Sequence, residues 1–212
     1  MIGRRICTPV VVCLGASALL SAALAQDQPV SGGQSTGLVV NTSARFQIWR
    51  MTTLGAYKGV DAYRSALDAA KIKIGDAAEE ILGRPAFSYE RTTTDVQLTL
   101  VWASELGVEF ESGLADVYKR AKNFGLTLCP AEIGPQLRLD YRNQPVGEAL
   151  DIAMEPVATY TGALTILALV NFGSGLALIG GEGRSDATVP RARRFVFALP
   201  TKGRLEVRSG PQ

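Results

Sequence analysis

The chain has 212 residues, with 22 Lys and Arg against 20 Asp and Glu, three cysteines and no histidine. Without histidine it has no Ser-His-Asp or Cys-His catalytic machinery, no His-ligated metal site and no imidazole pH switch. A hydrophobic share of 47% with 20% charged residues is typical of a folded chain, and the length indicates one domain with tails.

The first 25 residues predict a cleavable secretory signal. Arg4 and Arg5 form a short basic head, residues 6–25 carry no charge, and the small residues Ala23 and Ala25 precede Gln26. This is the layout of a signal peptide, and we expect a periplasmic or secreted protein. An uncleaved membrane anchor is the alternative, and the arginine pair leaves a twin-arginine route open beside the general one.

Removal of this signal changes the charge and the cysteine count. The remaining chain has 20 basic and 20 acidic residues, so its charge gives no reason to expect sequence-specific nucleic acid binding. Cys129 is then the one cysteine left. We expect a buried structural thiol, because no histidine is present to stabilise a thiolate.

Composition divides the rest of the chain into three parts. Residues 26–43 are rich in Gln, Gly, Ser and Thr, which predicts a flexible leader. Residues 44–200 contain the periodic apolar patterns and are expected to form the single domain, and residues 201–212 form a basic tail.

The first half of the domain shows mainly helical patterns. We expect a strand near residues 46–51, a helix over 60–71 and a short helix that opens at Asp76 and ends before Pro85. Alternating apolar residues predict a strand over 95–102. Ser112 is the expected cap of a third helix that ends at Gly125.

Strand patterns dominate after Leu128. Apolar residues alternate over 137–141, 150–154 and 195–199. About three helices followed by closely spaced strands predict an α+β fold, a single domain with a mainly antiparallel sheet and helices mostly in its N-terminal half.

The uncharged run 157–181 has two interpretations. It is long enough to span a bilayer, so membrane association is possible. Residues 171–175 (Asn-Phe-Gly-Ser-Gly) interrupt the run with turn chemistry, and the flanking apolar stretches 163–170 and 176–179 have strand length. We favour a buried β-hairpin.

One block carries a resemblance to a protein family. Residues 128–139 read Leu-Cys-Pro-Ala-Glu-Ile-Gly-Pro-Gln-Leu-Arg-Leu. With weaker matches elsewhere between Phe46 and Val157, this LCPAE-x-GPQLRL block resembles a group of short uncharacterised bacterial proteins. The resemblance implies no activity and no site residue.

Glu132, Arg138 and Glu148 are the candidate ligand-binding residues. Pro130 and Pro135 restrict the backbone around Glu132, and Arg138 lies on the polar side of the strand expected over 137–141. A turn after that strand would bring Glu148 close, so the three are expected to form one charged cluster. Either the cluster binds or cleaves a polar ligand, or Arg138 neutralises the two acids in a structural ion network.

Other candidates for chemistry have simpler explanations. Asp140, Asp151 and Glu155 have the oxygen ligands that calcium prefers, but they lack a compact loop spacing, and solvated strand faces explain them. We expect no metal and no cofactor. The segment from Arg184 to Arg208 has seven basic and two acidic residues, which indicates either weak polyanion contact or a solubilising tail.

Two function classes remain, with a toxin-like effector as a minor third. The first is a non-catalytic module of the cell envelope that binds a small polar ligand or an envelope partner. The second is a carboxylate-dependent hydrolase, possibly glycan-directed, that uses Glu132 and Glu148 with Arg138 and needs no histidine. Two carboxyl groups facing each other across an open groove would favour the hydrolase.

Overall fold

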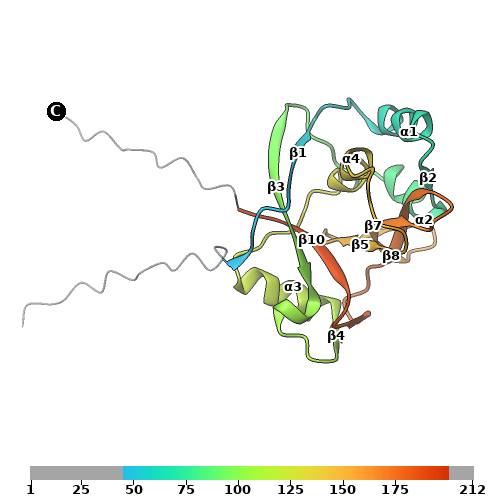
Figure 1. The fold of residues 1–212 in the computed structure, drawn as a ribbon. Coiled ribbons are helices and arrows are strands. Elements are labelled where there is room, and N and C mark those ends of the chain that lie inside the picture. Colours follow the sequence, from blue (N-terminus) through green and yellow to red (C-terminus); the bar gives the residue numbers. More distant parts are fainter. Residues whose placement is uncertain (1–44, 201–212) are drawn as a thin grey trace, which may run out of the picture. The chain divides into compact units, whose positions relative to one another are not determined.

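A computed structural model describes residues 45–200 of the chain (Figure 1). The expected signal over 1–25, the leader over 26–43 and the tail over 201–212 lie outside these residues. Within the described range, no helix has the length and apolar character needed to cross a membrane.

The secondary structure alternates short helices with strands of two to nine residues. The elements of residues 45–200 are β1 (Arg50–Leu54), α1 (Val60–Ala69), β2 (Lys73–Ile74), α2 (Asp76–Leu82), β3 (Thr94–Trp102), the 3₁₀ helix η2 (Ala103–Leu106), β4 (Glu111–Gly113), α3 (Leu114–Asn123), α4 (Ile133–Asp140), β5 (Ala149–Ile152), β6 (Val157–Ala158), β7 (Leu164–Asn171), β8 (Leu176–Glu182), β9 (Thr188–Pro190) and β10 (Arg194–Ala198).

One sheet organises the fold. Its strand order is β1-β3-β10-β5-β7-β8-β2, with β6 paired to β7, and β4 and β9 form a separate two-stranded sheet. The pairs β10–β5 and β2–β8 are parallel and the others are antiparallel. The predicted α+β fold with a mainly antiparallel sheet is therefore confirmed.

Helices cover both faces of the large sheet. Pairing register places Phe195, Asp151 and Ala168 on one face, and Leu167, the neighbour of Ala168, on the other. Tyr118 of α3 packs edge-on against Phe195, with ring centroids 6.3 Å apart, whereas Gly134 of α4 lies against the Leu167 side chain. The helices α3 and α4 thus lie on opposite sides of the sheet (Figure 1).

Several predicted elements form where the sequence indicates them. The helices expected over 60–71 and from Asp76 are α1 and α2, and the strand expected over 95–102 is β3. The uncharged run 157–181 forms β6, β7 and β8, with β7 and β8 paired antiparallel over seven residue pairs. The hairpin interpretation of this run is confirmed.

Two boundaries differ from the prediction. The first strand covers 50–54 instead of 46–51, because its pairing with β3 begins at Arg50. Ser112 does not cap α3: it belongs to β4, where it pairs with Val189, and Gly113 precedes the helix without a side-chain cap.

The strand expected over 137–141 is wrong, because residues 137–140 belong to α4 and Tyr141 follows its last residue. Alternating Leu137, Leu139 and Tyr141 suggested a strand with one polar face, but the intervening Arg138 is also buried. A helix enclosed on all sides shows no clear polar stripe, so the pattern misleads. Pro135 is tolerated as the third residue of α4, where its missing N–H has no intrahelical partner to lose.

Candidate functional site

Glu132 is fully buried at the start of α4, and its carboxylate joins three segments. Oε1 accepts hydrogen bonds from the Gly55 N–H (3.0 Å) and the Tyr63 hydroxyl (2.7 Å), and Oε2 accepts one from the Glu90 N–H (2.6 Å). Burial and the bond to Glu132 raise the pKa of Tyr63. All of these partners are groups of the protein itself, which is the pattern of a structural tie.

The bond to Gly55 requires a glycine. Gly55 has a φ of +74°, and a Cβ placed there would lie 2.4 Å from the Thr92 carbonyl oxygen. Only a residue without a side chain adopts this conformation at such close range. The backbone conformation of Gly55 therefore allows its N–H to donate to the buried Glu132 carboxylate.

Arg138 is a buried cation with neutral partners. Its Nη1 donates to Gln144 Oε1 and its Nη2 to the Tyr141 carbonyl, while Nε has no partner within residues 45–200. Burial, with a smaller contribution from the charge of Arg142, lowers the pKa of Arg138 to about 10. No salt bridge of the described range includes Arg138.

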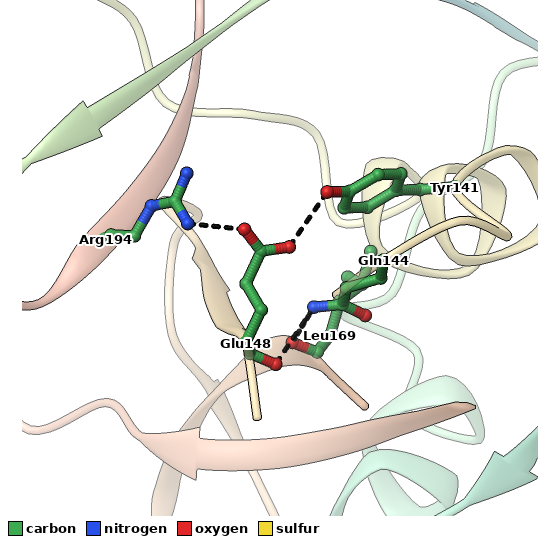
Figure 2. A network of polar contacts seen from close by, with 5 residues as sticks. All are labelled: Tyr141, Gln144, Glu148, Leu169 and Arg194. Atoms are coloured by element: carbon green, nitrogen blue, oxygen red, sulfur yellow. Dashed lines mark hydrogen bonds and ion pairs between the residues drawn. The ribbon is translucent and has the colours of Figure 1, made fainter. Parts of the chain in front are cut away.

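Glu148 lies just before β5 in a different network, which Figure 2 shows. Its Oε2 accepts a hydrogen bond from the Tyr141 hydroxyl (2.9 Å), and its Oε1 pairs with Arg194 Nη1. The Gln144 side-chain amide donates to the carbonyls of Glu148 and Leu169, each at 3.1 Å. The carboxylate is thus held from two sides.

The predicted single cluster of Glu132, Arg138 and Glu148 does not form. The prediction placed Arg138 on the polar face of a strand. In α4 its side chain is instead buried and donates to Gln144, and it makes no hydrogen bond with the carboxylate of Glu132 or of Glu148. Gln144 links Arg138 to the backbone of Glu148, whereas Glu132 belongs to the separate tie. The idea that Arg138 neutralises the two acids is therefore wrong.

An open hollow of about 720 Å³ lies beside Glu148. Its floor comes from one face of β7 and β8, where the lining residues are Ala168, Val170, Ile179 and Gly181, and Asp151 of the neighbouring β5 belongs to its wall. Ligand sites commonly have volumes of about 300–1,000 Å³ and mostly apolar walls with a few polar groups. We call this space the hollow.

Gly181 keeps the floor of the hollow open. A Cβ built on Gly181 would meet Ile166 at 3.7 Å and Asp151 Oδ1 at 3.8 Å, which are ordinary van der Waals distances. The backbone at this position thus tolerates a larger side chain. Such a side chain would fill part of the hollow.

Exposed apolar side chains surround the hollow. Trp102, Val146 and Phe172 all line it, and they are 42%, 74% and 61% exposed. The loops that carry two of them are linked, since the Gly147 N–H donates to the Asn171 carbonyl at 2.8 Å. Several exposed apolar residues gathered at one concavity indicate an interaction site more often than scattered single ones do.

Asp151 and Arg193 form a two-pronged ion pair in the wall of the hollow. Arg193 Nε donates to Asp151 Oδ2, and Nη2 donates to Oδ1 at 3.0 Å. The Asp151 side chain is only 3% exposed, which corrects the expectation that it lies on a solvated strand face. Burial raises the pKa of Asp151, and the bonds from Arg193 oppose this rise without cancelling it.

Arg194 forms the second charged group of the wall. Its guanidinium carbon lies 4.7 Å from the ring centroid of Trp102, a cation–π distance. Nη1 pairs with Glu148, and Nε is buried without a partner in the described range. Arg194 is thus positioned between an aromatic ring and a carboxylate.

The remaining sequence candidates for chemistry form no site of their own. Cys129 is buried and unpaired, and burial raises the pKa of its thiol, as expected for a structural cysteine. No group of three or more acidic or cysteine side chains suited to a metal ion is found in residues 45–200, so Asp140, Asp151 and Glu155 form none. Arg184 pairs with Asp186 at the surface.

Sequence reasoning identified Glu148 but missed its neighbours in the hollow. From the sequence, Asp151 is a candidate only as a calcium ligand, and Arg193 and Arg194 belong only to a basic end. A local signal is present, because the two arginines lie at the start of an apolar strand: Arg193 directly precedes β10 and Arg194 is its first residue. Their acidic partners depend on the parallel pairing of β10 with β5, which no local pattern reveals.

The arrangement combines apolar contact area with held charges. Glu148 and Asp151 line the same hollow, but each carboxylate is buried and engaged by an arginine. Glu132, the other acid of the predicted hydrolase pair, is fully buried and does not line the hollow. Comparison with protein families, curated proteins and solved structures found no match for the chain.

Proposed function

We propose that the protein is an exported, non-catalytic interaction module that binds a segment of a partner in the hollow. The observation that supports this proposal best is the combination of a preformed concavity with three exposed apolar side chains at its edge. Export rests on the signal pattern of residues 1–25, which makes the cell envelope or the exterior the place of action.

The charges of the hollow favour binding over catalysis. A general acid or a nucleophile in a glycosidase-type reaction needs a carboxyl group that is free to reach the substrate. The carboxylate oxygens of Asp151 instead accept hydrogen bonds from Arg193. Those of Glu148 accept hydrogen bonds from Arg194 and Tyr141. Such pairs hold the wall of a binding site in one geometry.

A selection experiment tests the proposal. A displayed library of short peptides is selected on the purified protein and, in parallel, on Gly181→Leu, whose added side chain fills the hollow. The Gly83→Leu protein is the matched control, because a Cβ at Gly83 also meets only ordinary contacts, the nearest at 3.5 Å. Sequences that enrich on wild type and Gly83→Leu but not on Gly181→Leu are expected. Failure to enrich any such sequence would contradict the proposal.

The second candidate is a carboxylate-dependent hydrolase that uses Glu148 with Asp151. Their presence in one hollow is the observation in its favour. Incubation with peptidoglycan and with chitin oligosaccharides, followed by product analysis, distinguishes it. Products that wild type forms and Glu148→Gln does not would establish the hydrolase and displace the interaction module.

A further inference from the structure

The charge that faces the hollow is mainly positive, although the wall contains as many acids as bases. The side chains of Arg193 and Arg194 are 44% and 24% exposed, whereas those of Asp151 and Glu148 are 3% and 9% exposed. Each pair therefore hides its carboxylate and presents its guanidinium. A ligand at this wall meets cationic hydrogen-bond donors.

Each guanidinium group has donors that no described residue uses. Arg193 uses Nε and Nη2 on Asp151, which leaves Nη1 without a partner in the described range. Arg194 uses Nη1 on Glu148 and its Nε is buried, so Nη2 is the nitrogen left for a ligand. Guanidinium donors match the oxygens of a carboxylate better than those of a neutral group. The ion pair with Asp151 and the ring of Trp102 restrict the two side chains, so little further ordering is needed on binding.

The floor of the hollow has a different chemistry. Ala168, Val170 and Ile179 offer apolar contact, and Gly181 adds depth. The floor thus suits an aliphatic or aromatic side chain, which loses contact with water when it lies there. The exposed side chains of Val146 and Phe172 extend this apolar surface outward, as expected for contact with a longer chain.

Because the acidic wall groups are hidden and the floor is apolar, we propose that the hollow binds a peptide segment with a carboxylate next to an apolar side chain. Arg193 and Arg194 bind the carboxylate, and the apolar side chain lies on Val170 and Ile179. This inference rests on the proposed function and names its ligand class. The carboxylate comes either from the C-terminus of the peptide or from an Asp or Glu side chain.

Three synthetic hexapeptide pools test the ligand class. In all pools the variable positions contain Leu, Ile, Val and Phe. The first pool has a free C-terminal carboxylate, the second has an internal Glu and an amidated C-terminus, and the third has Gln in place of Glu and is amidated. Retention on immobilised protein is measured by mass spectrometry, with Gly181→Leu as the blocked reference.

We expect the first or the second pool to be retained about tenfold or more above the third, since a hydrogen bond to a charged group contributes that much. Whichever pool is retained more identifies the source of the carboxylate. Equal retention of all three pools, lost in Gly181→Leu, would overturn the ligand class and leave the proposed function standing. Absence of any retention that depends on the hollow would contradict the proposed function as well.

Variants of the protein provide the second arm. The double variant Arg193→Gln/Asp151→Asn removes the charges together, so that no buried carboxylate is left unpaired. It is expected to lower retention of the carboxylate pools about tenfold and to leave the amidated Gln pool unchanged. Arg184→Gln is the matched control, because Arg184 also pairs with an aspartate but does not line the hollow.

An equal loss for all pools in the double variant, or no loss for any, would overturn the assignment of the carboxylate to this wall. If the double variant does not fold, as judged by circular dichroism, Arg194→Gln replaces it, because Glu148 then keeps the Tyr141 hydroxyl as a partner. The same difference between pools is expected there, and its absence overturns the assignment.

Discussion

Asp151 and Arg193 are 42 positions apart in the sequence, yet they form the two-pronged ion pair that builds one wall of the hollow. Parallel pairing of β10 with β5 brings them together, because Asp151 pairs in register with Phe195, two residues after Arg193. Arg193 lies just before β10, two residues from Phe195, and its guanidinium reaches Asp151 directly. The sheet topology thus sets the charge pattern of the candidate site.

The titration of Asp151 provides the first prediction. Its pKa in the folded protein is expected above the ordinary value of 3.8, because burial outweighs the effect of Arg193. Carbon-detected NMR of the Asp151 carboxyl group measures this directly. In Arg193→Gln the pKa is expected to rise further, whereas Arg184→Gln should leave it in place. A wild-type pKa at or below 3.8 would contradict the burial argument.

The raised pKa also fixes the sign of a stability effect. Over the range between 3.8 and the higher folded value, the folded protein keeps a proton on Asp151 that the unfolded chain has lost. The free energy of unfolding of the wild type should therefore fall, relative to Asp151→Asn, as the pH rises through this range. Urea unfolding at several pH values checks this, and an opposite trend would refute it.

Glu132→Gln is predicted to destabilise the protein and leave binding at the hollow intact. The amide nitrogen of Gln would face either the N–H of Glu90 or the donors at the other oxygen, so at least one buried donor loses its acceptor. We expect a loss of about 1–3 kcal/mol in the free energy of unfolding. Calorimetry measures this loss. Tyr63→Phe, which removes the hydroxyl that contacts Glu132 and Gln136, should cost less, because Gly55 and Glu90 still donate to the carboxylate.

Unchanged thermal stability of Glu132→Gln together with lost binding would instead make Glu132 a functional residue. That outcome would restore the sequence-based view of this acid as part of a ligand site. The burial of Glu132 and its three donors argue against it.

Tyr141→Phe tests the network of Figure 2. The change removes the hydroxyl bond to Glu148 and keeps the edge-on contact of the ring with Trp49, where the centroids are 5.2 Å apart. A loss of about 1 kcal/mol is expected, measured by urea unfolding. Binding of a peptide selected on the hollow should persist, because Arg194 still holds Glu148. A complete loss of binding would contradict the view that Arg194 alone keeps Glu148 in position.

Processing of the N-terminus tests the proposed export. Expression of the full chain in a bacterial host, followed by fractionation and N-terminal sequencing, is expected to give a periplasmic or secreted form that begins at Gln26. A product that retains Met1 and stays with the cytoplasmic fraction would contradict export.

Local patterns predicted the elements whose apolar residues face one neighbour. Tyr63 and Leu67 lie on one stripe of α1 and are buried, and β7 and β8 flank the predicted turn at 171–175. The pattern failed at α4, since burial of Arg138 and Gln136 beside Leu137 removed the polar stripe that marks a surface helix. For such a segment, tertiary contacts determine whether a helix or a strand forms.

The candidate site was less predictable than the fold. Glu148 was identified because it follows a turn, but its partner Arg194 comes from a strand 46 residues later. The hollow exists because strand order places β5 between β10 and β7. A single sequence contains no local signal for that order, so Arg193, Arg194 and Asp151 were not recognised as neighbours.

The most direct test of the account compares one peptide pool on three proteins. Peptides enriched on wild type are measured for retention on Gly181→Leu and on Gly83→Leu, after circular dichroism has shown that both variants are folded. The account predicts that retention falls at least tenfold on Gly181→Leu and stays at the wild-type level on Gly83→Leu. Equal retention on all three proteins would contradict the claim that the hollow is the binding site.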